Sequence, residues 1–217
     1  MTYILLFIAA ALSYFLRKLT LTGAITGWVV AAVIYTGAGY TSISLLAAFF
    51  MLASLATKGK GSKRTSGQVL ANGGVSAILG LCACIWPQNQ TLFQLMIAGS
   101  LASATADTLS SELGTVYGKR FFNIITFKND ERGLDGVISL EGTVIGLAGA
   151  AIIAITYCLL KSWGMQLFYI IAAGFMGNII DSVLGATLER KGFIGNNVVN
   201  FLNTTVGAVV CLLLFSL

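Results

Sequence analysis

Apolar residues fill almost the whole chain in eight long stretches, which are separated by short polar breaks. The stretches cover residues 3–16, 20–38, 41–57, 67–86, 91–114, 137–160, 165–188 and 196–216. A helix needs about 20 residues to cross the hydrocarbon core of a bilayer. The pattern therefore predicts an all-α polytopic membrane protein with about eight transmembrane helices in one domain, residues 1–217. Residues 1–86 form its first half and residues 91–217 its second.

The breaks differ in charge, and this difference predicts the orientation of the chain. Twelve of the 13 Lys and Arg residues fall in every second break, and only Lys161 falls on the other side. The basic segments are Arg17-Lys18, Lys58 to Arg64, Lys119 to Arg132 and Arg190-Lys191. Because loops rich in Lys and Arg stay in the cytoplasm, we expect these breaks to be cytoplasmic and both termini to lie outside. The expected location is a prokaryotic cell membrane, the inner one where there are two.

The composition excludes several classes of protein. Charged residues make up 10% of the chain, whereas a soluble domain carries about 25%. The chain has no His, so we expect no His general base, and any metal would be a hard cation bound by oxygen. The four Cys lie inside apolar stretches and are expected to be packing residues. The basic residues follow membrane orientation, so no nucleic-acid partner is expected. Met1 to Leu16 lacks a preceding basic segment and is expected to be a retained helix.

Two pairs of similar segments point to an internal repeat. Residues 20–27 resemble residues 139–146, and residues 70–77 resemble residues 201–208. The pairs favour a parallel repeat of four plus four helices, and chance similarity among helices rich in Gly and Ala is the alternative. Most glycines in these stretches are expected to allow close helix packing.

All eight carboxylates lie in the second half of the chain. A charged side chain at mid-bilayer costs about 2.5–3.5 kcal/mol or more, so an intramembrane carboxylate marks a candidate functional site. Helical spacing puts Ser103, Asp107 and Ser111 on one face and Glu112 about 140° away from Asp107. Asp181 lies on a stripe of small residues in a later stretch. The alternative is that these carboxylates only make hydrogen bonds between helices.

Amide side chains form further polar stripes that are expected to face inward, since Asn is costly against lipid. They are Gln68 and Asn72, Asn178 near Asp181, and Asn196, Asn200 and Asn203. Amides bind phosphate oxygens, ribose hydroxyls or metal-bound water. The alternative is that they hold helices together.

The segment from Gly118 to Thr143 mixes glycines, basic groups, hydroxyls and carboxylates, and it ends where an apolar stretch begins. A helix start favours a bound anion, and Lys and Arg supply charge for phosphates. The candidate phosphate-binding residues are Lys128, Arg132, Asp135, Gly136, Ser139, Glu141, Gly142 and Thr143. Membrane orientation alone explains Lys119 and Arg120.

The predicted topology brings these groups to one leaflet of the membrane. Mg²⁺ that bridges carboxylates to phosphates, with Lys and Arg on the outer phosphates, is typical of phosphoryl transfer. Asp107, Glu112 and Asp181 are therefore the candidate metal-binding and catalytic residues. The candidate substrate-pocket residues are Gln68, Asn72, Ser103, Ser111, Asn178, Asn196, Asn200 and Asn203. An acceptor that enters from the bilayer implies a lipid-tailed substrate.

Five segments together resemble one family. They are Arg64–Gly73, Ala104–Gly114, Asp135–Thr143, Gly177–Thr187 and Asn197–Asn203. In this order they are similar to the integral-membrane family that includes the plant phytyl-phosphate kinase (transmembrane protein 19-like), which is distantly similar to dolichol and phytol kinases. The resemblance implies a kinase that uses Mg²⁺ and CTP, or another nucleoside triphosphate, to convert a prenyl monophosphate into the diphosphate. Leu134 and Ile138 replace the small or polar residues usual in that family.

Two other functions remain as alternatives. A secondary transporter or ion channel would also carry buried carboxylates and repeats, but its site would sit near the midplane, and the outer halves of these stretches are almost wholly apolar. A related lipid-alcohol kinase or cytidylyltransferase would differ in its product. The sequence leaves open the prenyl chain length, the choice between CTP and ATP, and the oligomeric state.

Overall fold

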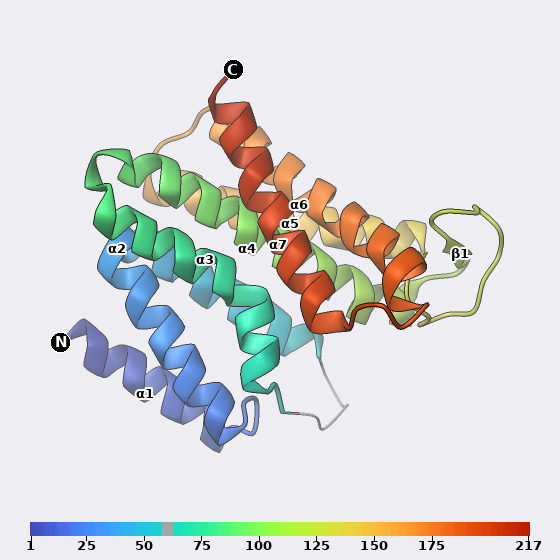
Figure 1. The fold of residues 1–217 in the computed structure, drawn as a ribbon, viewed down its shortest axis with the longest axis horizontal. Coiled ribbons are helices and arrows are strands. Elements are labelled where there is room, and N and C mark those ends of the chain that lie inside the picture. The colour runs from blue at the N-terminus through green and yellow to red at the C-terminus, as the bar shows by residue number, and fades with distance from the viewer. Residues whose placement is uncertain (58–62) are drawn as a thin grey trace.

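The computed structural model describes residues 1–57 and 63–217, which form helices joined by short turns (Figure 1). The helices are α1 (Thr2–Phe15), α2 (Leu21–Ala56), α3 (Ser66–Ile85), α4 (Gln90–Tyr117), α5 (Leu140–Leu160), α6 (Gln166–Leu184) and α7 (Asn196–Phe215). Smaller elements are the 3₁₀ turn η1 (Pro87–Asn89), the π-helical turn η2 (Gly185–Glu189), and the strands β1 (Phe122–Asn123) and β2 (Val137–Ile138). The all-α fold class is confirmed. Lys58 and Lys60 of the predicted basic segment lie outside the described residues.

The predicted stretches 20–38 and 41–57 correspond to the two halves of α2, which are separate helical segments that meet at Gly39. Both ends of α2 lie at the same side of the molecule, because Thr20 N donates to the Arg64 oxygen and Arg64 Nη2 to the Ala53 oxygen. Gly39 has φ 70° and ψ −162°, a non-helical conformation inside the 36-residue helix. Glycine adopts positive φ at little cost, so it allows the bend here. Side chains of α4 bind the carbonyl groups at the bend, since Gln90 Nε2 donates to the Gly37 oxygen at 2.9 Å and Gln94 Nε2 to the Ala38 oxygen at 2.7 Å.

Five helices are long and apolar enough to cross a membrane, judged over the described residues. They are Leu21–Ala56, Ser66–Ile85, Leu140–Leu160, Gln166–Glu189 and Asn196–Phe215. With 14 residues, α1 is short, and α4 has 28 residues but carries many hydroxyl and carboxyl groups. The predicted count of eight spans is therefore supported for only part of the chain, and the location of the termini stays a prediction.

The centre of the bundle is α4, which packs against α2, α3, α5, α6 and α7. Every residue from Ile97 to Asp107 is buried. Small residues make this packing close: a Cβ on Gly99 would lie 2.4 Å from the Gly207 oxygen, and one on Gly174 would lie 2.5 Å from the Ala150 Cβ. The predicted role of glycines in helix packing is confirmed at these positions.

The helix ends gather on two sides of the molecule. The side that we call the basic end holds Arg17–Thr20, Lys63–Thr65, the loop 118–139 and Arg190–Gly195. There, Thr20 N donates to the Arg64 oxygen at 3.0 Å, and Lys18 Nζ donates to the Ser54 oxygen at 3.0 Å. The opposite end holds the Gly39 bend, η1 and both chain termini (Figure 1). This arrangement agrees with the alternation of breaks that the sequence predicts.

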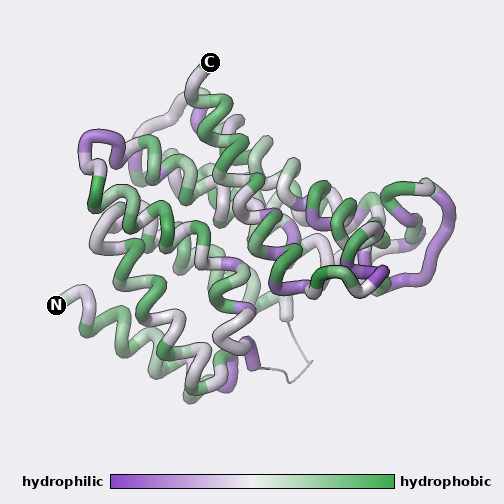
Figure 2. The backbone as a smooth tube through the Cα atoms, viewed as in Figure 1, coloured by the Kyte–Doolittle hydropathy of each residue, from purple (hydrophilic) through white to green (hydrophobic). Residues whose placement is uncertain are grey.

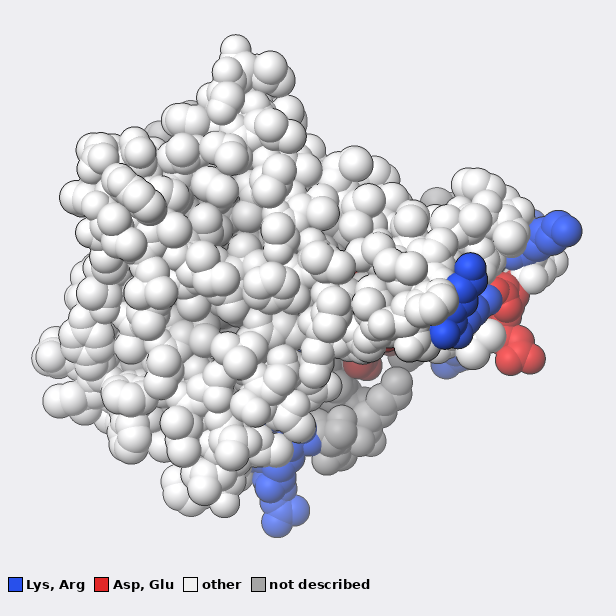
Figure 3. All heavy atoms as spheres, in the orientation of Figure 1, with Lys and Arg blue, Asp and Glu red and all other residues white. Residues whose placement is uncertain are grey.

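The surface between the two ends is mostly apolar. Large hydrophobic side chains are exposed on α1 and α5, including Ile4 (64%), Phe7 (58%) and Leu159 (69%). The backbone is green along the helices and purple in the loop that carries β1 (Figure 2). In the view of Figure 3, charged side chains appear at the rim and the surface between them is white. A surface of this kind suits contact with lipid.

The predicted stretch 137–160 begins later than expected, because Val137 and Ile138 pair with β1 as an antiparallel strand. Ser139 caps α5, its Oγ accepting from Gly142 N at 3.1 Å. Thr20 caps α2 in the same way, its Oγ1 accepting from Gly23 N at 3.0 Å. Equivalent positions of the two similar segments thus have the same role, and the full repeat stays a prediction.

Candidate functional site

Two neighbouring carboxyl groups lie between α4 and α6, towards the basic end. Asp107 is only 8% exposed, Asp181 is half-buried, and each carboxyl group acts electrostatically on the other. Ser111 Oγ, one turn along α4, donates to Asp107 Oδ1 at 3.3 Å. Two carboxyl groups so close together need a shared proton or a cation between them. This pair is the centre of the candidate site.

A third helix supports the pair through Asn203 of α7. Asn203 Nδ2 donates to Asp181 Oδ2 at 2.6 Å. Ser103 Oγ of α4 contacts the Asn203 backbone oxygen at 2.9 Å and its Oδ1 at 3.1 Å. Ser103 and Asn203 are fully buried, and Gly177 of α6 lets Ser103 approach closely. The structure thus joins polar residues from three of the stretches that the sequence predicted.

Further carboxylates lie near this pair. The charges of Asp135 and Asp181 both act on Glu189, which ends η2 and lies near Asn196 at the start of α7. Glu189 was not among the predicted site residues, although it borders the same apolar stretch as Asp181. The π-helical turn at Gly185–Glu189 changes the helical register there, so ordinary helical spacing from Asp181 does not place Glu189 correctly.

The loop 118–139 lies against the end of α6. Gly136 has φ 74°, and a Cβ on it would lie 2.3 Å from both the nitrogen and the Cβ of Ala186. An ion pair holds the loop further along, between Arg190 Nη1 and Asp130 Oδ2 at 2.7 Å. The hydrogen bond from Arg190 holds the pKa of Asp130 below its usual value, helped by the Glu131 backbone N–H. These contacts keep Asp135 near the carboxyl pair.

The other predicted phosphate-binding residues have different surroundings. Lys128 and Arg132 are exposed on the loop. Ser139 and Gly142 already bond to each other in the α5 cap, and Gly142 packs against Gly114 of α4. Thr143 Oγ1 donates to the Ser139 oxygen at 3.0 Å. Glu141 Oε2 accepts from the backbone of the loop, at Lys119 N, at 3.4 Å. Lys128 and Arg132 therefore have the accessible charge, and the α5 cap has a structural role.

Glu112 does not join the carboxyl pair. Its charge acts on Arg64. Burial lowers the pKa of Arg64 below its usual value, and the negative charge of Glu112 offsets part of this shift. Among the described residues, no three or more Asp, Glu or Cys side chains are grouped so that they could hold a metal ion. The structure therefore separates Glu112 from Asp107 and Asp181, which the sequence grouped as one metal-binding set. A pair still fits Mg²⁺, because this ion is usually held by one or two carboxylates together with substrate phosphates.

The predicted pocket amides have three kinds of surroundings. Asn203 is buried beside the carboxyl pair, and Asn178 is buried on α6, which carries Asp181. Gln68 closes the α3 cap, where its Oε1 accepts from Thr65 N at 3.0 Å. Asn72 Nδ2 donates to the Gln68 oxygen at 3.0 Å and Asn200 Nδ2 to Asn196 Oδ1 at 3.3 Å, while the Oδ1 atoms of Asn72 and Asn200 are buried without a hydrogen-bond partner in the described structure.

The fold and the site define an all-α integral membrane protein with a carboxyl pair near its basic end. The chain belongs to the family described as Integral membrane protein DUF92, which matches residues 4–208. This match confirms the family resemblance that the five sequence segments predict.

Three relatives show the spread of the family. The chain is 35% identical over 187 residues to the uncharacterized membrane protein MJ0933 of Methanocaldococcus jannaschii, covering 82% of this chain and 77% of that protein. It is 33% identical over 202 residues to the uncharacterized membrane protein sll0875 of Synechocystis, covering 85% and 78%. It is 29% identical over 216 residues to Protein VTE6, chloroplastic, of Arabidopsis thaliana, covering 90% and 65%. No solved structure gives a significant match.

Proposed function

We propose that this protein transfers a phosphoryl group from CTP, or another nucleoside triphosphate, to a prenyl monophosphate. The observation that carries the proposal is the pair Asp107–Asp181, supported by Ser111 and Asn203. A water-filled pathway would not need such a pair at one end of the bundle, whereas phosphoryl transfer does need fixed negative charge to hold a cation against phosphates. The similarity to Protein VTE6 and the five family segments support the same activity.

In the proposed reaction, an oxygen of the acceptor phosphate forms a bond to the γ-phosphorus of the donor. The bond between that phosphorus and the β–γ bridging oxygen breaks, and the nucleoside diphosphate leaves. Bound Mg²⁺ would supply charge neutralisation between the phosphates. Because the acceptor phosphate is already an anion, no strong general base is required, which suits a chain without His.

The residues of the chain have separate roles in this proposal. Asp107 and Asp181 would hold the cation, while Ser111 and Asn203 fix the orientation of these two carboxyl groups. Lys128 and Arg132 bind the outer phosphates of the nucleotide from the loop. Asp135 and Gly136 place that loop over the end of α6, so that it excludes water from the reacting groups. In this proposal the basic end is cytoplasmic, where nucleotide is available, and both termini lie outside.

The test uses the purified full chain in nanodiscs with prenyl monophosphates of several chain lengths, Mg²⁺, and CTP or ATP labelled at the γ-phosphate. Labelled prenyl diphosphate is the expected product. Its mass separates it from the monophosphate that an alcohol kinase would make and from the CDP-lipid of a cytidylyltransferase. Folded protein that makes no diphosphate at any chain length would refute the proposal. Flux of ions or solutes through liposomes without nucleotide would favour the transporter.

A further inference from the structure

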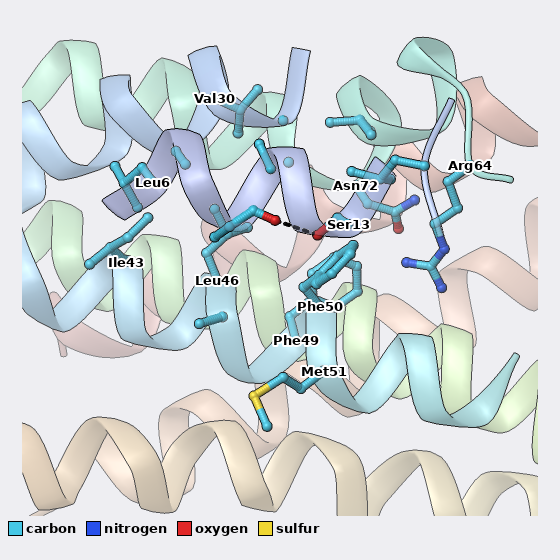
Figure 4. Close-up of a pocket in the computed structure, with 18 of the residues that line it drawn as sticks. Leu6, Ser13, Val30, Ile43, Leu46, Phe49, Phe50, Met51, Arg64 and Asn72 are labelled. Carbon is cyan, nitrogen blue, oxygen red and sulfur yellow. Dashed lines mark hydrogen bonds between the residues drawn. The ribbon is translucent and has the colours of Figure 1, made fainter. Parts of the chain in front are cut away.

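A cavity of about 440 Å³ lies between α1, α2 and α3, separate from the carboxyl pair (Figure 4). Small-molecule sites typically enclose about 300–1,000 Å³. Its walls are apolar and include Leu6 of α1, Val30 and Ile43 on the two sides of the Gly39 bend, and Leu46, Phe49 and Phe50 further along α2. No sequence pattern predicted this cavity, because its walls come from helices that the bend in α2 brings together.

One end of the cavity is polar and cationic. Arg64 and Asn72 lie there, away from Leu6 and Ile43 (Figure 4). The Arg64 guanidinium donates through Nη2 to the Ala53 oxygen at 3.2 Å and to Thr57 Oγ1 at 3.3 Å. Its other N–H groups remain for a ligand, since a guanidinium carries five donors. Asn72 Oδ1 is buried and has no hydrogen-bond partner in the described structure. A buried polar atom without a partner is unusual and needs an explanation.

We propose that this cavity holds the isoprenoid tail of a lipid monophosphate, with the phosphate oxygens at the Arg64 guanidinium. Asn72 Oδ1 is an acceptor, so it would pair with the hydroxyl of a monoprotonated phosphate. The inference rests on the proposed function, because it names where the lipid substrate of that reaction is held. The apolar walls exclude a soluble anion as the main occupant, and Arg64, the cation among the described residues that line the cavity, matches one anionic head. The charge of Glu112, a residue of α4, reaches Arg64, which links this head position to the helix that carries Asp107.

The α1 side of the cavity provides a route from the bilayer. None of the residues of α1, all of which are described, is buried. Side-chain hydrogen bonds join α1 to α2 near the start of α1, at Thr2–Tyr40 and Tyr3–Thr36 (both 3.0 Å), and further along Leu6, Leu12 and Leu16 line the cavity itself. The lipid therefore enters between α1 and α2, with its tail first surrounded by membrane and then by the cavity walls.

Filling the cavity tests the position of the tail. Gly27 lines the cavity, and a Cβ on it would meet only Leu19 Cδ1, at an ordinary 3.8 Å. Gly27→Phe therefore fits the helix and places a ring in the tail position. Val29→Phe is the matched control, since Val29 is 47% exposed on the same helix and does not line the cavity.

The probe is farnesyl monophosphate with a photoreactive diazirine in its tail, added to the full chain in nanodiscs without nucleotide. We expect labelling of peptides that contain Leu6, Leu46 or Phe50 in the unchanged protein and in Val29→Phe. Labelling should fall at least about tenfold in Gly27→Phe, the change that corresponds to weakening binding by about 1.4 kcal/mol. Labelling elsewhere, or equal labelling of both variants, would overturn the proposal.

A second comparison tests the head group. Arg64→Gln should lower labelling by the phosphate probe about tenfold or more, because a hydrogen bond to a charged group is lost, and should leave labelling by the matching farnesol probe unchanged. Excess inorganic phosphate should not displace the probe. Equal labelling by farnesol and farnesyl monophosphate in the unchanged protein would mean that any bilayer lipid fills the cavity, and would overturn the assignment of the head.

The two proposals fail differently. If the cavity is labelled as expected but no diphosphate forms, the kinase proposal fails and the lipid site stands. If diphosphate forms equally well in Gly27→Phe and Val29→Phe, with the same KM for farnesyl monophosphate, the kinase proposal stands and the lipid site fails.

Discussion

Asn203 Nδ2 on α7 donates a 2.6 Å hydrogen bond to Asp181 Oδ2 on α6, and the same Asn203 side chain receives a bond from Ser103 of α4. One amide therefore joins three helices beside the carboxyl pair. Inside a membrane, where water does not compete, such a network fixes both the position of the carboxylate and the packing of the helices.

Asn203→Ala should therefore impair both stability and activity. The variant removes the donor to Asp181 Oδ2 at the fully buried Asn203 position, which costs about 1–3 kcal/mol, while Ser103 keeps its bond to the backbone oxygen of residue 203. Thermal unfolding in detergent should show a lower midpoint, and prenyl-phosphate phosphorylation should fall in protein that remains folded. Asn89→Ala is the control, because Asn89 is exposed and makes no side-chain cap bond. An unchanged midpoint for Asn203→Ala would contradict the network.

Asp107 and Asp181 should matter more for phosphorylation activity than Glu112. Asp107→Asn and Asp181→Asn should each lower phosphorylation by about 100-fold or more, as expected when a group that stabilises transition-state charge is removed. Glu112→Gln should have a much smaller effect, because Glu112 acts on Arg64 and lies outside the pair. Rates measured at saturating nucleotide and Mg²⁺ provide the comparison. If Glu112→Gln were as inactive as Asp107→Asn, the three-carboxylate metal site expected from sequence would be favoured instead.

Gly136 should be sensitive to substitution because the loop touches α6 at this point. Gly136→Ala combines a positive φ with a clash against Ala186, whereas Gly133→Ala has a positive φ of 84° and nothing within 4 Å. Backbone strain of this kind costs about 1–3 kcal/mol, so only the additional clash distinguishes the two variants. Limited proteolysis of the loop should be faster in Gly136→Ala than in Gly133→Ala. Equal cleavage of both would show that the loop does not pack on α6.

The ion pair Asp130–Arg190 predicts a pH dependence. The folded-state pKa of Asp130 lies below its unfolded value of about 3.9. The stabilisation that Asp130 contributes to the folded state is therefore present above that pH and is lost as the pH falls through the folded-state pKa. A dye attached through Leu134→Cys should gain rotational freedom in this acid range, measured by fluorescence anisotropy. Asp130→Asn should remove the transition, and Glu131→Gln should retain it because the ion pair is formed by Asp130.

The orientation of the chain can be tested with cysteine labelling in cells. In a variant in which the exposed Cys84 is replaced by Ala, a cysteine at Leu134 should react with a membrane-impermeant maleimide only in inverted vesicles. A cysteine at Gln88 in η1 should react in intact cells. This follows from the Lys and Arg content of the breaks. The reverse pattern would place the basic end, with its proposed nucleotide site, outside the cell and would contradict the proposed function.

The sequence allowed much of the fold to be predicted because each helix boundary has a local cause. Gly39 interrupts an apolar run, Ser139 and Thr20 supply cap hydroxyls, and Lys and Arg mark the breaks at one end. It did not predict that two glutamines of α4 bind the carbonyl groups at the Gly39 bend, because this contact joins residues more than 50 positions apart. It also did not predict the strands β1 and β2, which are too short to have a pattern of their own.

For the site, the residue types were visible in the sequence and their grouping was not. Asp107, Asp181, Ser103 and Asn203 stand out because polar groups are costly in a membrane. Their spacing within one helix does not tell which residues of other helices they meet. Glu112 was grouped with Asp107 because both lie in the second half of α4, yet its charge acts on Arg64, which precedes α3.

By itself, the sequence determined the class of protein, the helical stretches and the alternation of basic breaks, since each depends on transfer free energies and charges of neighbouring residues. Only the tertiary structure decided which carboxylates form a pair, how Asn203 supports them, and that α1, α2 and α3 enclose a cavity with Arg64 at its end. These features depend on distances between residues far apart in the chain, and close contact through small residues such as Gly99 and Gly207 sets those distances.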